Sequence, residues 1–80
     1  MISERYPISE KMADDLKRRF TYHPPKGSQP ARYVAIREKA RELAELIVRC
    51  SHESREQSLA LTKLEECAMW ANAGIARNED

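Results

Sequence analysis

The chain has few aromatic residues, few glycines, almost no net charge and no long hydrophobic run. Aromatic residues make up 6% of its 80 residues, two residues are glycine, and the formal net charge is +1. Two glycines are too few for a glycine-rich phosphate-binding loop. A balance of 14 basic against 13 acidic residues is unlike the clearly basic surface of a protein that binds duplex nucleic acid. No apolar segment is long enough to span a membrane.

Cysteine and histidine are also scarce, with two of each. Because no signal peptide precedes Cys50 and Cys67, we expect a reducing cytoplasm and two free, largely buried thiols. His23 and His52 lie in separate loops and share no zinc-ligand spacing with the cysteines. No nucleophile is paired with a base and an orienting third group. We therefore expect no enzyme, no catalytic residue, no metal and no cofactor.

What the sequence does contain is helical periodicity. Apolar residues spaced three and four apart predict a short helix over residues 9–20 and long helices over 30–50 and 55–77. Prolines and a glycine make residues 21–29 a loop. Two long helices joined by a short turn lie side by side and antiparallel. The expected fold is all-α: one domain over residues 1–80, with a short helix laid against a two-helix hairpin.

Capping signals support these boundaries. Ser9 is placed to cap the first helix. Ser28 or Gln29 is expected to cap the second, which has a proline in its first turn. Ser54 followed three residues later by Gln57 has the spacing of a capping box at the start of the third helix.

One hairpin cannot enclose its own apolar surface. A chain of this size seldom keeps more than about 3–5 kcal/mol of net stability without a further stabilising element. Several apolar residues lie off the main helical lines and need another subunit to cover them: Leu46, Val48, Leu59 and Met69. We therefore expect a symmetric homo-oligomer.

The last helix has an unusual composition, with Trp70 and Asn72 among small residues and Arg77 and Asn78 at its end. Small residues let helices approach closely, which suits packing between subunits. Trp70 is either a packing residue or a stacking platform. Asn72 is either a buried hydrogen-bonding group at an interface or a ligand contact. The terminal arginine and amide suit an anionic, hydrogen-bonding ligand.

The loop before the second helix offers a second candidate site. His23 either satisfies a neighbouring backbone group or forms, with Tyr22, a rigid aromatic pair that stacks on a planar base. Nearby cations are either part of a solvated helix face or neutralise phosphates, and they include Lys26, Arg37 and Lys39.

Three segments together resemble the phage anti-CBASS nucleotide-sponge family, whose helical hairpin is shared with a phage anti-Thoeris sponge. The segments are FTYHPP (residues 20–25), QPARYVAIREKARELA (residues 29–44) and SLALTKLEECAMWANAGIARN (residues 58–78). The resemblance covers most of the chain, with its most specific matches in the aromatic-His-Pro loop and in MWANAGIARN.

The resemblance implies a phage protein in the cytoplasm of an infected bacterium. It implies a homohexamer that binds cyclic dinucleotides and cyclic trinucleotides in separate pockets without cleaving them, so that host CBASS effectors stay inactive. Tyr22 matches the base-stacking position, and Arg37 or Lys39 matches the phosphate contacts. Arg77 and Asn78 are the candidates for the trinucleotide pocket.

Together with His23, Lys26 and Asn72, these residues form the candidate ligand-binding set. The rival hypothesis is a helical protein–protein interaction module with no nucleotide ligand, whose Trp70 surface docks another protein. An RNA-binding helix pair ranks third, because the near-zero net charge disfavours it.

Overall fold

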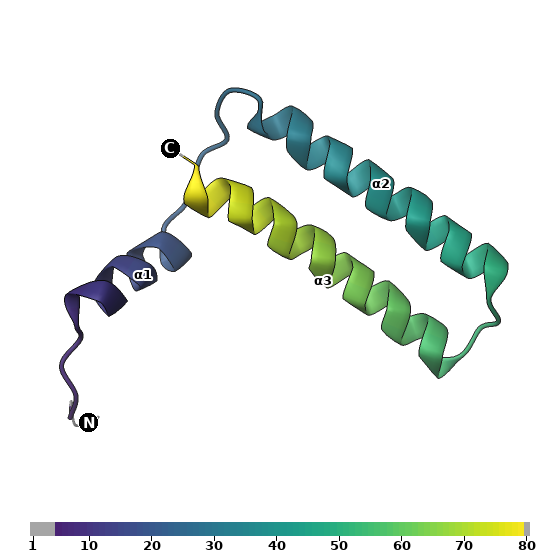
Figure 1. Ribbon diagram of the computed structural model, residues 1–80, viewed down its shortest axis with the longest axis horizontal. Coiled ribbons are helices and arrows are strands. Elements are labelled where there is room, and N and C mark those ends of the chain that lie inside the picture. Colours follow the sequence, from purple (N-terminus) through teal and green to yellow (C-terminus); the bar gives the residue numbers. More distant parts are fainter. Residues whose placement is uncertain (1–4, 80) are drawn as a thin grey trace.

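A computed structural model describes residues 5–79, which form three helices and no strand. They are α1 (Glu10–Phe20), α2 (Gln29–Cys50) and α3 (Arg55–Asn78). Helices α2 and α3 lie side by side and antiparallel, and α1 lies beside the C-terminal end of α3 (Figure 1). The all-α prediction is confirmed for these residues. The predicted domain also includes residues 1–4 and 80, which lie outside the described part.

Two predicted helix caps are present. The Ser9 hydroxyl accepts a hydrogen bond from the Met12 N–H at 3.1 Å, and the Ser54 hydroxyl accepts one from the Gln57 N–H at 3.1 Å. Each satisfies one of the N–H groups left free in a first helical turn. Ser28 is the N-cap of α2, but its backbone is helical (φ −83°, ψ 0°) and its side chain makes no capping bond.

The turn between α2 and α3, which we call the tip of the hairpin, differs from a capping box in one bond. In that motif the side chain of Gln57 would return to the Ser54 N–H. Gln57 is only 8% exposed, and its amide nitrogen donates instead to the carbonyl and hydroxyl oxygens of Ser51, at 3.2 and 3.0 Å. The glutamine therefore joins the start of α3 to the end of α2.

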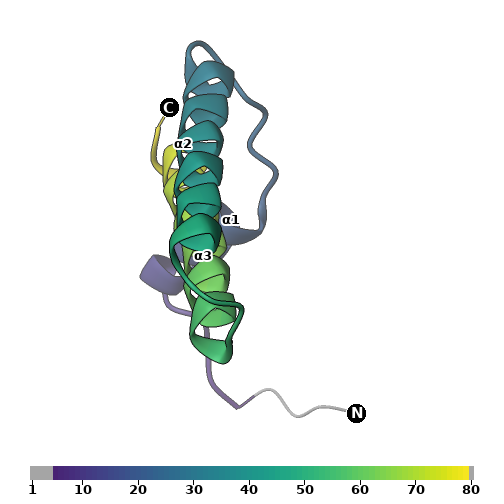
Figure 2. The same cartoon turned by 90° about the vertical axis from the view of Figure 1, so that its right-hand side faces the viewer.

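The two long helices meet along a narrow seam of half-buried residues. Within residues 5–79, no apolar side chain is fully buried. The hairpin is one layer of helices thick (Figure 2). Its radius of gyration is 17.9 Å, against about 12 Å for a compact chain of this length. The seam contains small and aliphatic residues from both helices, among them Ile36, Ala40, Ile47, Leu61, Leu64 and Ala68.

The prediction of buried thiols is wrong for the single chain. Cys50 and Cys67 are both free and exposed. Cys50 is the last residue of α2, and Cys67 precedes the seam residue Ala68, which turns it about 100° away from α2. On α1, the apolar side chains of Met12 and Phe20 are also exposed, whereas Leu16 between them is half-buried.

Candidate functional site

The open end of the hairpin is closed by a buried glutamine. Gln29 is 3% exposed, and its amide nitrogen donates to the Ile75 carbonyl at 3.5 Å and to a Glu79 carboxylate oxygen at 3.3 Å. Its amide oxygen accepts from the Lys26 N–H at 3.1 Å. One side chain therefore joins the loop, the start of α2 and the end of α3.

An ion pair reinforces this closure. The Arg32 guanidinium binds both carboxylate oxygens of Glu79, at 2.6 and 2.7 Å. These hydrogen bonds, followed by the one from Gln29, lower the pKa of Glu79 from 4.5 to about 2. The same hydrogen bonds raise the pKa of Arg32. We call Gln29, Arg32 and Glu79 the clasp.

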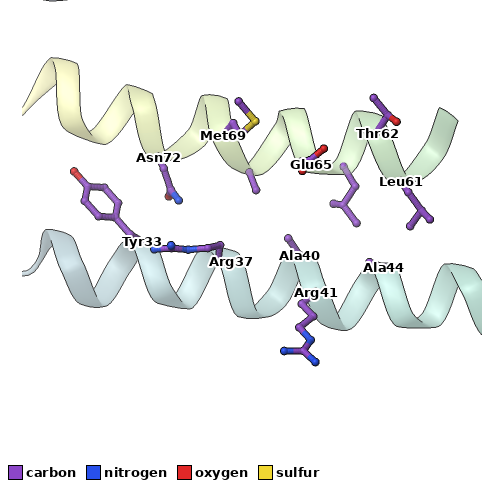
Figure 3. A pocket seen from close by; sticks show the side chains of 12 residues that line it. Tyr33, Arg37, Ala40, Arg41, Ala44, Leu61, Thr62, Glu65, Met69 and Asn72 are labelled. Carbon is purple, nitrogen blue, oxygen red and sulfur yellow. The ribbon is translucent and has the colours of Figure 1, made fainter. Parts of the chain in front are cut away.

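Beside the clasp, a groove runs along one face of the hairpin between α2 and α3. It encloses about 870 Å³ and is open to solvent along its length. Figure 3 shows side chains from both helices along it. They are Tyr33, Arg37, Ala40, Arg41 and Ala44 from α2, and Leu61, Thr62, Leu64, Glu65, Ala68, Met69 and Asn72 from α3.

Three polar side chains line the clasp end of the groove, and the other polar lining residues, Arg41, Thr62 and Glu65, lie further toward the tip (Figure 3). Tyr33 and Asn72 point toward one another from opposite helices, and the Arg37 side chain lies between the helices (Figure 3). The Tyr33 hydroxyl and the Asn72 carbonyl oxygen are buried and have no hydrogen-bond partner within residues 5–79. A buried polar group without a partner costs about 1–3 kcal/mol. These two groups are therefore free to bond to another molecule in the groove.

Arg37 is the cation available at this end of the groove. Among the described residues, no carboxylate lies within ion-pair distance of its guanidinium. Arg41, one turn further along α2, pairs with Glu45 at 3.3 Å. Arg37 therefore keeps its hydrogen-bond donors available for an anion.

A second hollow lies where α1 meets the end of α3. It encloses about 350 Å³ and is lined by Asp15, Arg18, Arg19, Trp70, Ala73, Gly74, Arg77 and Asn78. Arg18 donates to the Asn78 side-chain oxygen at 3.1 Å, which ties α1 to α3. We call this site the α1 hollow.

The structure does not bring the predicted residues together in one site. Arg37 and Asn72 line the groove, whereas Arg77 and Asn78 line the α1 hollow. Lys39 lines neither of these cavities and pairs with Glu42 at 3.1 Å. Every role assigned to these residues in ligand binding stays a prediction.

The loop residues lie apart from both cavities. Tyr22 is 79% exposed. The Nε2 atom of His23 is 2.7 Å from the Arg18 carbonyl oxygen, and since a carbonyl only accepts, Nε2 donates. This is the backbone bond expected in one of the two interpretations of His23. The backbone N–H of Lys26 donates to Gln29.

Among the lining residues that were not predicted as site residues, Tyr33, Arg18 and Arg19 have side chains suited to binding a ligand. Tyr33 lies one helical turn before Arg37, so a search for polar neighbours on that face would have found it. Arg18 and Arg19 are visible in the sequence as a basic cluster at the end of the first helix. No local pattern indicates that this cluster meets α3, because the connecting loop sets that geometry.

Within residues 5–79, no three histidine, cysteine or acidic side chains are grouped so as to hold a metal ion. No helix in that range combines the length and apolar character needed to cross a membrane.

Comparison with known proteins identifies the family. The model of the Acb2/Tad1 hairpin domain matches residues 12–76. The match takes in most of α1, all of α2 and α3 as far as Ala76, and ends just before Arg77 and Asn78. Neither the curated proteins nor the solved structures give a significant match. Because the matched residues span most of the chain, it belongs to the Acb2/Tad1 hairpin-domain family.

Proposed function

We propose that this chain is a phage protein that binds cyclic oligonucleotide messengers and holds them without cleaving them. The proposed ligands are cyclic dinucleotides and cyclic trinucleotides, and the proposed effect is that host CBASS effectors stay inactive. It would act in the cytoplasm of the infected bacterium. The observation that carries the proposal is that the family's hairpin places Arg37 and Asn72 on opposite walls of one open groove.

The chemistry of the groove suits such a ligand. A guanidinium binds the two free oxygens of a phosphodiester with a matching pair of N–H groups. The Tyr33 hydroxyl both donates and accepts, and the Asn72 carbonyl oxygen accepts, which are the functions that a base edge or a ribose hydroxyl can complete. Holding a ligand requires affinity and no proton transfer, so these groups suffice without a general base.

The exposed Tyr22 ring completes the proposed dinucleotide site by stacking on a base, which is worth about 1–3 kcal/mol. It lies outside the groove of its own chain. In the proposed assembly, rings and cations of different copies would meet at the same ligand. Arg77 and Asn78 remain our candidates for the trinucleotide pocket.

The exposed surface supports the proposed homohexamer. The chain exposes 7277 Å², whereas a compact protein of its mass exposes about 5,000 Å². Standard protein interfaces remove about 800 Å² from each partner, so the excess is enough for more than one interface. Exposed apolar side chains are part of this surface, at Leu43, Leu46, Val48, Leu59 and Met69.

Calorimetric titration with cyclic di- and trinucleotides tests the proposal, followed by heating the complex and analysing the released ligand. We expect tight binding and recovery of the ligand intact. Arg37→Ala and Asn72→Ala should each weaken binding of at least one ligand about tenfold or more, since hydrogen bonds to charged groups are worth about 1.5–3 kcal/mol. Arg49→Ala is the matched control, because Arg49 is on α2 outside the groove.

Two results would contradict the proposal. Recovery of linear or shortened nucleotides would show cleavage. Failure to bind any cyclic nucleotide, with a monomer on size exclusion, would instead favour the protein–protein interaction module.

A further inference from the structure

We propose that α1 belongs to the binding machinery, with Arg18 and Arg19 as phosphate-binding residues of the α1 hollow. The ligand class is a phosphate-bearing molecule with a planar ring. This inference deepens the proposed function and rests on it for the identity of that molecule. Neither arginine is part of the predicted ligand-binding set.

The α1 hollow is positively charged. Three guanidinium groups line the hollow, those of Arg18, Arg19 and Arg77, against the single carboxylate of Asp15. Both oxygens of that carboxylate are engaged, by Arg18 at 2.8 Å and by Arg19 at 3.4 Å. The lining therefore has two positive charges in excess, and a phosphate group would compensate them.

The two arginines of α1 are held in place by bonds within the chain. Asp15 holds the two guanidinium groups of α1 side by side, and the Asn78 side-chain oxygen accepts a further bond from Arg18 at 3.1 Å. Asn78 is itself held, because its amide nitrogen donates to the Gly74 carbonyl at 2.9 Å. Fixing cationic side chains before binding reduces the entropy lost when a ligand arrives. An arginine also keeps donors free after making two bonds, since it has five.

One wall of the hollow is an exposed aromatic ring. Trp70 is 66% exposed, and the Arg77 guanidinium lies over its ring, 5.9 Å from the ring centre. An exposed indole beside fixed cations offers a stacking surface for a planar group whose phosphate reaches the arginines. The small residues Ala73 and Gly74 line the same hollow and leave space beside the ring.

Trp70 also makes the inference testable, because it is the only tryptophan and lies in the hollow itself. We would titrate the full chain with inorganic pyrophosphate and separately with a cyclic trinucleotide, and follow tryptophan emission. Both ligands should change the emission, and the nucleotide should bind more tightly because it also stacks. A response to pyrophosphate alone would mean that the site takes free phosphate and would overturn the planar-ring part of the inference.

The decisive variant is Arg18→Ala/Arg19→Ala, which should weaken both ligands tenfold or more. The matched control, Lys11→Ala/Lys17→Ala, removes the same charge from α1 at residues outside the hollow and should leave affinity unchanged. Equal losses in the two variants would reduce the effect to net charge and overturn the proposal. Helix content measured by circular dichroism checks that the alanine variant is folded. If it is not, Arg18→Lys/Arg19→Lys replaces it as the test, and this variant should retain partial binding because it keeps both positive charges.

The same titrations separate this inference from the proposed function. One outcome would overturn the inference alone. In it, cyclic nucleotides bind and binding depends on Arg37, but binding does not depend on Arg18 and Arg19 and does not change Trp70 emission. In the opposite outcome, pyrophosphate binds through Arg18 and Arg19 but no cyclic nucleotide binds. That result would support the anion site and contradict the proposed function.

Discussion

The two ends of the hairpin are closed by bonds of very different sequence range. At the tip, Ser54 and Gln57 bond to Ser51 and His52, residues only two to six positions away. At the open end, the clasp joins residues 46 to 50 positions apart. The tip can therefore form within one short segment, whereas the clasp requires α2 and α3 to be packed along their whole length. Tyr33, Arg37 and Asn72 of the groove lie at the end that depends on long-range packing.

The largest expected effect comes from removing the buried glutamine of the clasp. Gln29→Ala leaves the Lys26 N–H and the Ile75 carbonyl without their partner, at a cost of about 1–3 kcal/mol for each group that stays buried. Gln57→Ala is the matched variant at the tip, where both lost bonds go to Ser51. Urea unfolding at one protein concentration should show a greater loss for Gln29→Ala. Equal losses would contradict the greater importance of the clasp.

A smaller effect is expected from the helix caps. Ser54→Ala should lower the unfolding free energy by about 1 kcal/mol, because its hydroxyl caps the Gln57 N–H. Ser28→Ala is the control at the other long helix. The Ser28 hydroxyl makes no capping bond and only accepts from the exposed Arg32 side chain at 3.1 Å. If Ser28→Ala lowered the unfolding free energy as much as Ser54→Ala does, the Ser28 hydroxyl would cap α2 as the Ser54 hydroxyl caps α3.

A still smaller effect should appear with pH. The pKa of Glu79 is about 2, below its ordinary 4.5, so its contribution to stability is complete above about pH 4.5 and is lost as the pH falls toward 2. Glu79→Gln should flatten that part of the profile, measured as the unfolding midpoint against pH. Glu45→Gln, which removes an exposed carboxylate paired with Arg41, should change it less. The same slope in both variants would remove Glu79 from the acid response.

The smallest effect on stability is expected beside the clasp. Tyr33→Phe removes a buried hydroxyl that has no partner within residues 5–79, so unfolding should be unchanged or slightly harder. The same substitution should weaken cyclic nucleotide binding if the hydroxyl contacts the ligand. Thermal unfolding and calorimetric titration of one preparation measure both. A clear loss of stability would show that the hydroxyl has a structural partner in the assembly.

The contrast between tip and clasp also explains what the sequence could predict. The Ser9 and Ser54 caps depend on residues three apart, and both are present in the structure. Gln29 was proposed only as a helix cap, because its bonds to Ile75 and Glu79 depend on the packed hairpin. For the same reason, Arg37 and Asn72 were chosen separately, and only the structure places them on one groove.

The position of α1 was harder to predict. Its apolar residues suggested an ordinary packing face, yet Met12 and Phe20 are exposed and its bond to α3 is polar, from Arg18 to Asn78. The residues around a short amphipathic helix do not reveal which surface it meets. The α1 hollow therefore follows from the structure alone.

The single-layer thickness of the hairpin has a consequence for how the protein can diverge. A substitution in an ordinary core removes about 2–5 kcal/mol when a large aliphatic residue becomes alanine, so most such changes are eliminated. In this chain, no apolar side chain of residues 5–79 is shielded in that way. Substitutions on its exposed faces therefore change what another molecule encounters before they change the fold. Such a chain can acquire new binding preferences through single mutations that leave it folded.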